Sequence, residues 1–268
     1  MKNLRLVLPI MMIASAIFTS SCEKEDTTCY PGTIIKNDTI FVGDSAPNQV
    51  LEFDGTAQRI YYPSDDAQSM INGATDYTIE AWVKPLSEEI NNKLILKRYY
   101  QYALTMYKDD LKKVYFTHYA NDGTTTYINT IENVLTIGEW NHIAVINNSV
   151  TNEMKIYVNG VDVTLQHYDA IPLEAEPDLA SATYDPNFYL AYASKVYSNI
   201  QLDEVRVIKE AVDPADLRLK MDDPNYKMNY NTSVLMHFDE GKGNFIVNEA
   251  NNAEVFFEDG KQPTFVKL

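Results

Sequence analysis

The chain has 268 residues, of which 38 are acidic and 22 are basic, and its formal net charge at pH 7 is −16. This excess of acid argues against nucleic acid and anionic headgroups as partners, because both carry negative charge. Only two cysteines are present, Cys22 and Cys29, so no disulfide framework is expected to hold the fold.

The amino terminus has the features of a segment that directs export. Residues 4–18 are almost wholly apolar, Lys2 and Arg5 supply positive charge, and three small residues follow at 19–21. A run of this length is too short to span a bilayer, so the pattern predicts a secretory signal peptide over residues 1–21. Its removal takes away two basic residues and no acid, which leaves 20 basic against 38 acidic residues and a net charge of −18.

Cys22, which follows the small residues directly, resembles the cysteine of the lipobox in bacterial lipoproteins. In that family the signal is cut before the cysteine, which then carries acyl chains; Thr19 stands where the lipobox usually has leucine. Several acyl chains, at roughly 0.8 kcal/mol per buried methylene, anchor a protein stably without a membrane span. The resemblance therefore implies lipidation of Cys22 and attachment to the membrane by the lipid anchor only.

The residues after Cys22 bear on the membrane face that the chain occupies. Lys24-Glu25-Asp26 resembles the lysine-plus-acidic tag that sends lipoproteins of the Bacteroidetes to the outer face of the outer membrane. We therefore expect a chain anchored in the outer membrane and facing the cell exterior. A solvated linker without signal meaning, with a periplasmic location, is the alternative.

Beyond the anchor, the sequence divides into a tether and one large domain. Residues 22–48 are rich in Thr, Pro, Gly, Asn and Asp, and the apolar runs at 34–35 and 39–42 predict an edge hairpin within this tether. Cys29 lies there without a local His or basic partner, so we expect it to be inert. From residue 49 to 268, short β-branched and aromatic runs recur between Asn, Asp and Gly, which predicts an all-β sandwich domain.

Local patterns in this domain predict strands and a tight turn. In Tyr77–Lys84 the odd-numbered positions from Ile79 to Val83 are apolar and share one face, which is the period of two that is typical of a strand. Lys155–Val158 and Val161–Val163 are joined by Asn159-Gly160, a pair that tolerates the positive φ angles of a type I′ hairpin turn.

One short helix is expected near the C-terminus. Asp213 can cap it, Pro214 suits the first helical position, and Asp216 lies near the positive end of the helix dipole. Leu217, Leu219 and Met221 would continue the helix until Pro224 closes it. Strands resume at Ser233–Phe238, Phe245–Val247, Ala253–Phe257 and Thr264–Val266.

A series of short motifs resembles the laminin-G-like branch of the concanavalin A-like jelly rolls. In chain order they are Leu51–Gly55, Thr78–Pro85, Glu139–Val145, Lys155–Gly160 and Asp203–Val207. The resemblance implies a two-sheet antiparallel jelly-roll sandwich over residues 49–268. Val234–Gly243 is similar to the strand and glycine turn that often opens such domains; because it comes after the expected helix here, we expect it to complete the same sandwich.

The sequence gives little support for an enzyme. Related jelly rolls hydrolyse polysaccharides with two carboxylates about 5 to 10 Å apart. Glu80, however, is the only acid on its face of Tyr77–Lys84. Asp203 and Glu204 are adjacent, so they are expected on opposite faces of their strand. The four histidines show no metal-ligand spacing. His142 is therefore interpreted as a structural histidine. A degenerate glycoside hydrolase remains a second alternative.

One structural calcium is a further expectation, because related jelly rolls often bind such an ion at a rim through loop oxygens. Asp54, in the turn after the first strand, and Asp203, which opens a late strand, are the ligands that we would name. An Asx turn beside Gly55 is the alternative role for Asp54. No other cofactor is expected.

Binding is the function that remains. Tyrosine is common, with 19 residues, and Tyr184, Tyr189, Tyr192 and Tyr197 form one of two groups; its flat ring and polar tip suit sugars and protein interfaces alike. We expect a non-catalytic domain that recognises glycan, with a protein-binding accessory subunit of an outer-membrane uptake or adhesion complex as the alternative. Trp82 and Trp140 are expected to be core or sheet-face residues, and Arg206 is expected to pair with a carboxylate. The loop from Ile171 to Asn187 is expected to form a recognition rim.

Overall fold

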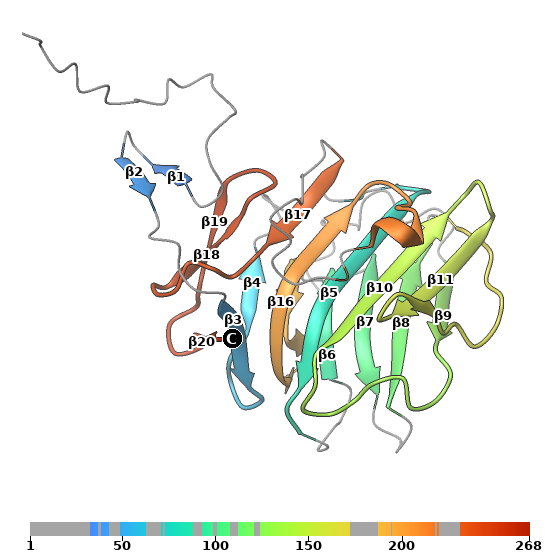
Figure 1. Cartoon of the computed structure of the whole chain (residues 1–268), viewed down its shortest axis with the longest axis horizontal. Helices are drawn as coiled ribbons and strands as arrows, with labels where there is room; N and C mark the ends of the chain where they lie inside the picture. Colours follow the sequence, from blue (N-terminus) through green and yellow to red (C-terminus); the bar gives the residue numbers. More distant parts are fainter. Residues whose placement is uncertain are drawn as a thin grey trace, which may run out of the picture. The chain divides into compact units, whose positions relative to one another are not determined.

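The computed structural model of the chain describes two strands near the N-terminus and most residues from 49 onward (Figure 1). The described residues are 33–36, 39–42, 49–62, 71, 73–87, 93–98, 101–107, 112–120, 124–171, 187–193, 195–217, 219 and 231–268. The predicted signal peptide, both cysteines and the loop at 172–186 lie outside them. Within the described residues, no helix is long and apolar enough to cross a membrane.

The two N-terminal strands form a hairpin. β1 (Thr33–Lys36) pairs antiparallel with β2 (Thr39–Val42), with Ile35 opposite Ile40. Contacts divide the chain into one compact unit at residues 1–43 and a second at 44–268. The domain boundaries proposed from the sequence stay predictions.

The larger unit is built on an eight-stranded antiparallel sheet, as far as the chain is described. Its order is β12-β11-β10-β5-β16-β3-β20, with β17 paired to the second half of β16. The strands are β3 (Gln49–Asp54), β5 (Tyr77–Pro85), β10 (Asn141–Asn148), β11 (Glu153–Val158), β12 (Val161–Asp162), β16 (Asn199–Ile208), β17 (Thr232–Met236) and β20 (Thr264–Lys267).

A six-stranded antiparallel sheet forms the second layer, in the order β4-β13-β6-β7-β8-β9 over the described residues. Its strands are β4 (Ile60–Tyr62), β6 (Lys93–Arg98), β7 (Tyr102–Tyr107), β8 (Lys113–Tyr119), β9 (Thr125–Asn129) and β13 (Phe188–Leu190). Two small hairpins accompany it, β14 (Tyr192–Ala193) with β15 (Val196–Tyr197) and β18 (Phe245–Asn248) with β19 (Ala253–Phe256). In Figure 1, β5, β10 and β16 lie in front of β6, β7 and β8.

Both sheets contribute to one apolar core, which confirms the predicted all-β sandwich. Ile79, Ala81 and Val83 of β5 are fully buried in it, as the period of two indicated. Phe116 and Ile128, from the six-stranded sheet, are buried in the same cluster. Burying such side chains is the main favourable contribution to folding, roughly 1.5–3 kcal/mol for each large apolar residue.

The predicted turn and the C-terminal strands are also confirmed. Asn159 and Gly160 have φ angles of 51° and 78°, and they join β11 to β12 as a type I′ turn does. β17 pairs with β16 and β20 pairs with β3, so the segment after residue 231 completes the same sandwich.

The predicted helix is reduced to a 3-10 turn at Pro214–Asp216. Asp213 caps it as expected, because its Oδ1 accepts a hydrogen bond of 2.9 Å from the backbone N–H of Ala215. Leu217 then adopts extended angles, φ −60° and ψ 146°, and buries its side chain against Ala144 and Ile146. Tertiary burial of this leucine ends the helix where local sequence would continue it; Met221 and Pro224 lie outside the described residues.

Candidate functional site

The outer face of the eight-stranded sheet carries a buried ion network. The Glu80 carboxylate pairs with the Arg206 guanidinium, and its Oε2 lies 3.0 Å from Nε2 of His142. The three side chains are at most 6% exposed. These contacts match the structural roles expected for His142 and Arg206, and they hold the three side chains inside the protein instead of on its surface.

A bulge in β16 changes the expected directions of Asp203 and Glu204. Asp203 is opposite Trp82 and Arg206 is opposite Glu80, so two residues of β16 face the single residue between them on β5. Glu204 has a φ of 52°, and Leu202 and Val205 both enter the core. The alternation of side chains between the two faces of the sheet is therefore interrupted at this bulge. It cannot be used to place Asp203 and Glu204 on opposite faces.

Both acids at this bulge are buried. Oδ1 of Asp203 accepts a hydrogen bond of 2.9 Å from the backbone N–H of Glu204, and the Glu204 carboxylate lies 2.9 Å from Nδ1 of His237. Each acid is 1% exposed.

The two residues named for calcium do not come together. Oδ1 of Asp54 accepts hydrogen bonds of 2.8 and 3.4 Å from the N–H groups of Thr56 and Ala57, which is the Asx turn given as its alternative role. Asp54 is opposite Asn199, four residues along β16 from Asp203, or roughly 13 Å at strand spacing. Among the described residues no group of three His, Cys, Asp or Glu side chains could hold a metal ion. Calcium binding stays a prediction.

The outer face of the six-stranded sheet differs in chemistry. Its described outward positions, apart from the bulge at Leu94 and Ile95, are Tyr61, Lys97, Ala103, Thr105, Lys113, Tyr115, Thr117, Tyr119, Thr125, Tyr127, Asn129 and Tyr189. We call this surface the tyrosine–threonine face. None of these described positions carries a carboxylate, although the chain has 38 acidic residues.

The strand register aligns six positions of this face in a row across the sheet. Tyr189 is opposite both Tyr61 and Lys97, and the row continues through Ala103 and Thr117 to Tyr127. The tyrosines at its two ends are 36% and 64% exposed. Six strands at a spacing of about 4.8 Å place these ends roughly 24 Å apart.

A chain of tyrosine rings extends the face at the β4–β13 edge. Ring centroids are 5.6 Å apart between Tyr61 and Tyr189, 5.4 Å between Tyr189 and Tyr192, and 4.9 Å between Tyr192 and Tyr197. The second tyrosine group of the sequence is thus assembled in space, except for Tyr184, which lies outside the described residues. No pattern in the sequence indicates that Tyr61 or Tyr127 belongs on the same surface, because strand register joins segments that are far apart in the chain.

Two cations border the tyrosine chain. The Arg59 guanidinium lies 4.5 Å from the ring centroid of Tyr192 and pairs with Glu258 through Nε at 2.9 Å. The Lys261 ammonium donates a hydrogen bond of 3.3 Å to the hydroxyl of Tyr197. These contacts fix the rings and leave donors beside them. Tyr189 is only 5% exposed, so the ring surface open to a ligand belongs to Tyr61, Tyr192 and Tyr197.

Other aromatic residues lie outside the tyrosine chain. Tyr102 is fully buried and packs near Phe116, and burial raises its pKa. Trp82 is half-buried, with its ring 5.4 Å from that of His142, and Trp140 is also half-buried. Trp82 in β5 therefore has the sheet-face position expected of it, whereas Trp140 directly precedes β10.

Sequence comparison places this sandwich in a family. The model of the concanavalin A-like lectin/glucanases superfamily named Laminin_G_3 matches residues 54–218, more than half of the chain. The chain belongs to this superfamily. No functionally curated protein matches the concanavalin A-like chain.

Solved structures share the fold at low identity. A candidate carbohydrate-binding protein from Bacteroides ovatus ATCC 8483 is 16% identical, with a TM-score of 0.58 over 83% of this concanavalin A-like chain. The match spans 60% of that protein. Two matches are looser. A pentraxin from Limulus polyphemus is 16% identical, with a TM-score of 0.43 over 63% of this chain and 79% of that one. The CBM40 of a Ruminococcus gnavus sialidase is 13% identical, with a TM-score of 0.46 over 63% of this chain and 95% of that one.

Proposed function

We propose that the chain is a non-catalytic glycan-binding protein and that the tyrosine–threonine face is its recognition surface. The observation that carries the proposal is a broad, partly exposed face with tyrosine and threonine and without carboxylates at its described positions, in a chain of net charge −16. Tyrosine rings pack against the C–H faces of sugars, and hydroxyl groups donate and accept hydrogen bonds with sugar hydroxyls. The fold that the chain shares with a candidate carbohydrate-binding protein is consistent with this role.

The same face argues against glycoside hydrolysis there. A glycosidase needs two carboxyl groups on either side of the scissile bond, and the described outward positions of the six-stranded sheet supply none. The buried Glu80 bonds to His142 and Arg206 on the other sheet. The superfamily includes glucanases, so the hydrolase alternative is tested directly by sugar release from a bound polysaccharide.

Affinity electrophoresis in gels that contain soluble polysaccharides tests the proposal, after a glycan array has identified a ligand. Tyr127→Ala removes an exposed ring at one end of the row and should weaken binding about tenfold, the upper range for an aromatic contact. Phe256→Ala, which removes a ring that is also more than half exposed but lies outside the face, is the matched control. Equal retardation of both variants would show that the tyrosine–threonine face does not bind the polysaccharide. Capture of a large membrane protein without any glycan binding would support the accessory-subunit alternative.

We further propose that lipid on Cys22 anchors the chain in the outer membrane, with the domain outside the cell. What supports this proposal is the cysteine that directly follows the small residues at 19–21, together with the Lys24-Glu25-Asp26 segment after it.

The anchor is tested by fractionation and protease shaving. Cys22→Ala should move the chain from the membrane to the soluble fraction, because it removes the site of acylation. Protease added to intact cells should cleave the parent chain. Survival of the chain while a known surface protein is cut would place it on the periplasmic side. Calcium is tested separately, since a chelator that leaves the melting temperature unchanged would exclude a structural ion.

A further inference from the structure

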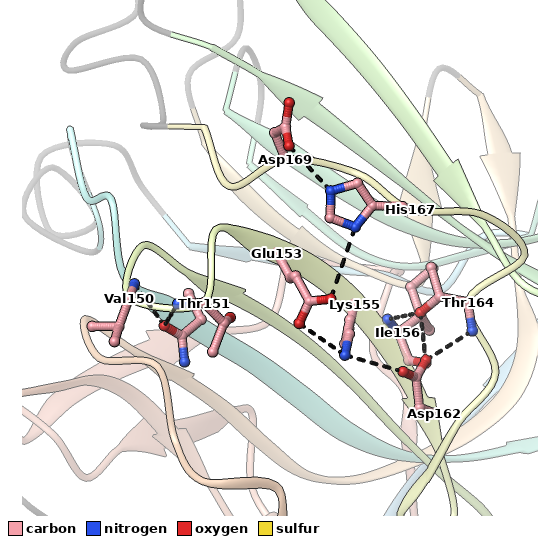
Figure 2. Close-up of polar contacts among 10 residues, drawn as sticks. Val150, Thr151, Glu153, Lys155, Ile156, Asp162, Thr164, His167 and Asp169 are labelled. Atoms are coloured by element: carbon pink, nitrogen blue, oxygen red, sulfur yellow. Dashed lines mark hydrogen bonds and ion pairs between the residues drawn. The ribbon is translucent and has the colours of Figure 1, made fainter.

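A pocket of about 350 Å³ lies where the chain after β12 returns along β11 (Figure 2). The returning segment, residues 163–168, is called the strap. Thr164 Oγ1 accepts a hydrogen bond of 2.9 Å from the N–H of Ile156, and the carbonyl of Tyr168 accepts one of 2.9 Å from Met154. The strap therefore takes four residue steps where β11 takes only two. It bows away from the strand, and the pocket, which is partly open to solvent, lies between them.

The strap is held from its other side as well. The N–H of Leu165 donates a hydrogen bond of 2.9 Å to the carbonyl of Asn129, and the N–H of Ile131 donates one of 2.9 Å to Val163. These bonds fix the strap to the end of β9, at the edge of the six-stranded sheet opposite β4. The pocket is therefore preformed, and it is separate from the tyrosine chain at the β4–β13 edge.

Charged groups alternate along the pocket. The Lys155 ammonium lies 2.9 Å from Glu153 Oε2 and 3.5 Å from Asp162 Oδ2, an acceptor–donor–acceptor sequence that Figure 2 shows. The hydrogen bond to Glu153 raises the pKa of Lys155, so the ammonium remains charged. Each carboxylate has several lone-pair sites, and the ammonium has three N–H donors, so capacity for a ligand remains.

Another wall adds a ring and further polar groups. His167 lies between Asp169, at 3.1 Å from Nε2, and Glu153, at 3.8 Å from Nδ1. Tyr168 and the half-exposed Leu165 supply apolar surface to the same pocket. This mixture is typical of sites that hold small polar molecules by a few directed hydrogen bonds and one apolar contact.

The arrangement selects among ligand classes. An anion would meet the carboxylates of Glu153 and Asp162, and a metal cation would meet the Lys155 ammonium that lies between them. A sugar hydroxyl donates one hydrogen bond and accepts others, so adjacent hydroxyls can bond to a carboxylate and an ammonium at once. We propose that this pocket is a second saccharide site, which takes one neutral pyranose unit through vicinal hydroxyls. The site does not depend on binding at the tyrosine–threonine face.

Methyl NMR tests the proposal on the full chain, because Leu165 is 50% exposed and is one of the residues that line the pocket. The chain labelled at leucine methyl groups is titrated with D-glucose, D-galactose, D-mannose and L-fucose. At least one of these sugars should shift the Leu165 signal in a saturable way. Lys155→Gln and Glu153→Gln should each weaken that binding about tenfold, the loss expected for a hydrogen bond to a charged group.

Two controls separate this site from the proposed face. Glu139→Gln, an exposed change elsewhere, should bind as the parent does, and so should Tyr127→Ala. The proposal is overturned if no sugar moves the Leu165 signal, or if Lys155→Gln and Glu153→Gln, with unchanged melting temperatures, bind as tightly as the parent. It is also overturned if Tyr127→Ala abolishes the Leu165 shift. Loss of polysaccharide retardation with the Leu165 shift intact would reject the tyrosine–threonine face alone.

Discussion

At the residue scale, Glu240 is a side chain whose burial makes stability depend on pH. It follows β17 and is mostly buried, and its Oε1 accepts a hydrogen bond of 2.7 Å from the N–H of Val247. Burial raises the pKa of Glu240 from 4.5 to about 7, with smaller contributions from Glu249 and Asp239. The folded chain therefore favours the protonated carboxyl.

The sign of the pH effect follows from this direction. In the unfolded chain Glu240 ionises near 4.5, whereas in the fold it stays protonated until about pH 7. The contribution of Glu240 to the free energy of unfolding is thus most favourable below the pKa of the unfolded chain, and it falls as pH rises from 4.5 to 7. At about 1.36 kcal/mol per pKa unit, the ionised group costs about 3 kcal/mol above pH 7.

Glu240→Gln should remove that cost, because glutamine is neutral and keeps an oxygen for the Val247 N–H. Urea unfolding should show the variant to be more stable than the parent by up to about 3 kcal/mol at pH 8 and equal to it near pH 4.5. The exposed Glu139→Gln is the control and should show no such trend. A difference that does not change with pH would contradict the assignment.

At the element scale, the 3-10 turn at Pro214–Asp216 shows how packing overrides local sequence. Asp213, Pro214 and Asp216 are good helix-starting residues, yet the helical turn ends after Asp216 because Leu217 is used as a packing residue. It joins Ala144, Ile146 and Tyr157 in a small apolar cluster on the outer face of the eight-stranded sheet. The cluster fixes the chain that crosses this face.

Leu217→Ala should lower the free energy of unfolding by about 2 kcal/mol, at the low end for buried leucines because the cluster is small. Leu219→Ala is the matched control, since Leu219 is 42% exposed, and its effect should stay within about 0.5 kcal/mol. Thermal or urea unfolding measures both. Equal effects at the two positions would show that Leu217 packing does not hold this segment.

At the scale of the whole molecule, the C-terminal segment is integral to the sandwich although the family match ends at residue 218. β17 pairs with β16, and β20 pairs with β3. Val234, Met236 and Phe238 are fully buried in the common core. A chain without this segment would expose strand edges and apolar core surface together.

Truncation after residue 230 should therefore abolish the cooperative unfolding transition. Deletion of residues 1–43, which form the other compact unit, is the control and should leave the transition of the domain almost unchanged. Near-UV circular dichroism during heating distinguishes the outcomes. A cooperative transition in the C-terminal truncation would show that β17 and β20 are dispensable.

The sequence by itself determined the features that depend on neighbours along the chain. The period of two in β5 and the Asn159-Gly160 turn were predictable because side-chain alternation and positive φ preferences are local. The family motifs added the two-sheet fold. The structure alone decided how strands align, and so which side chains share a surface.

Tyr61 and Tyr189 are 128 positions apart in the chain, and only the register of β4 and β13 makes them neighbours. The bulge at Glu204 and the extended Leu217 likewise depend on partner strands. Register, bulges and burial are set by contacts between segments that are distant in sequence, and a periodic pattern contains no information about which segments will meet.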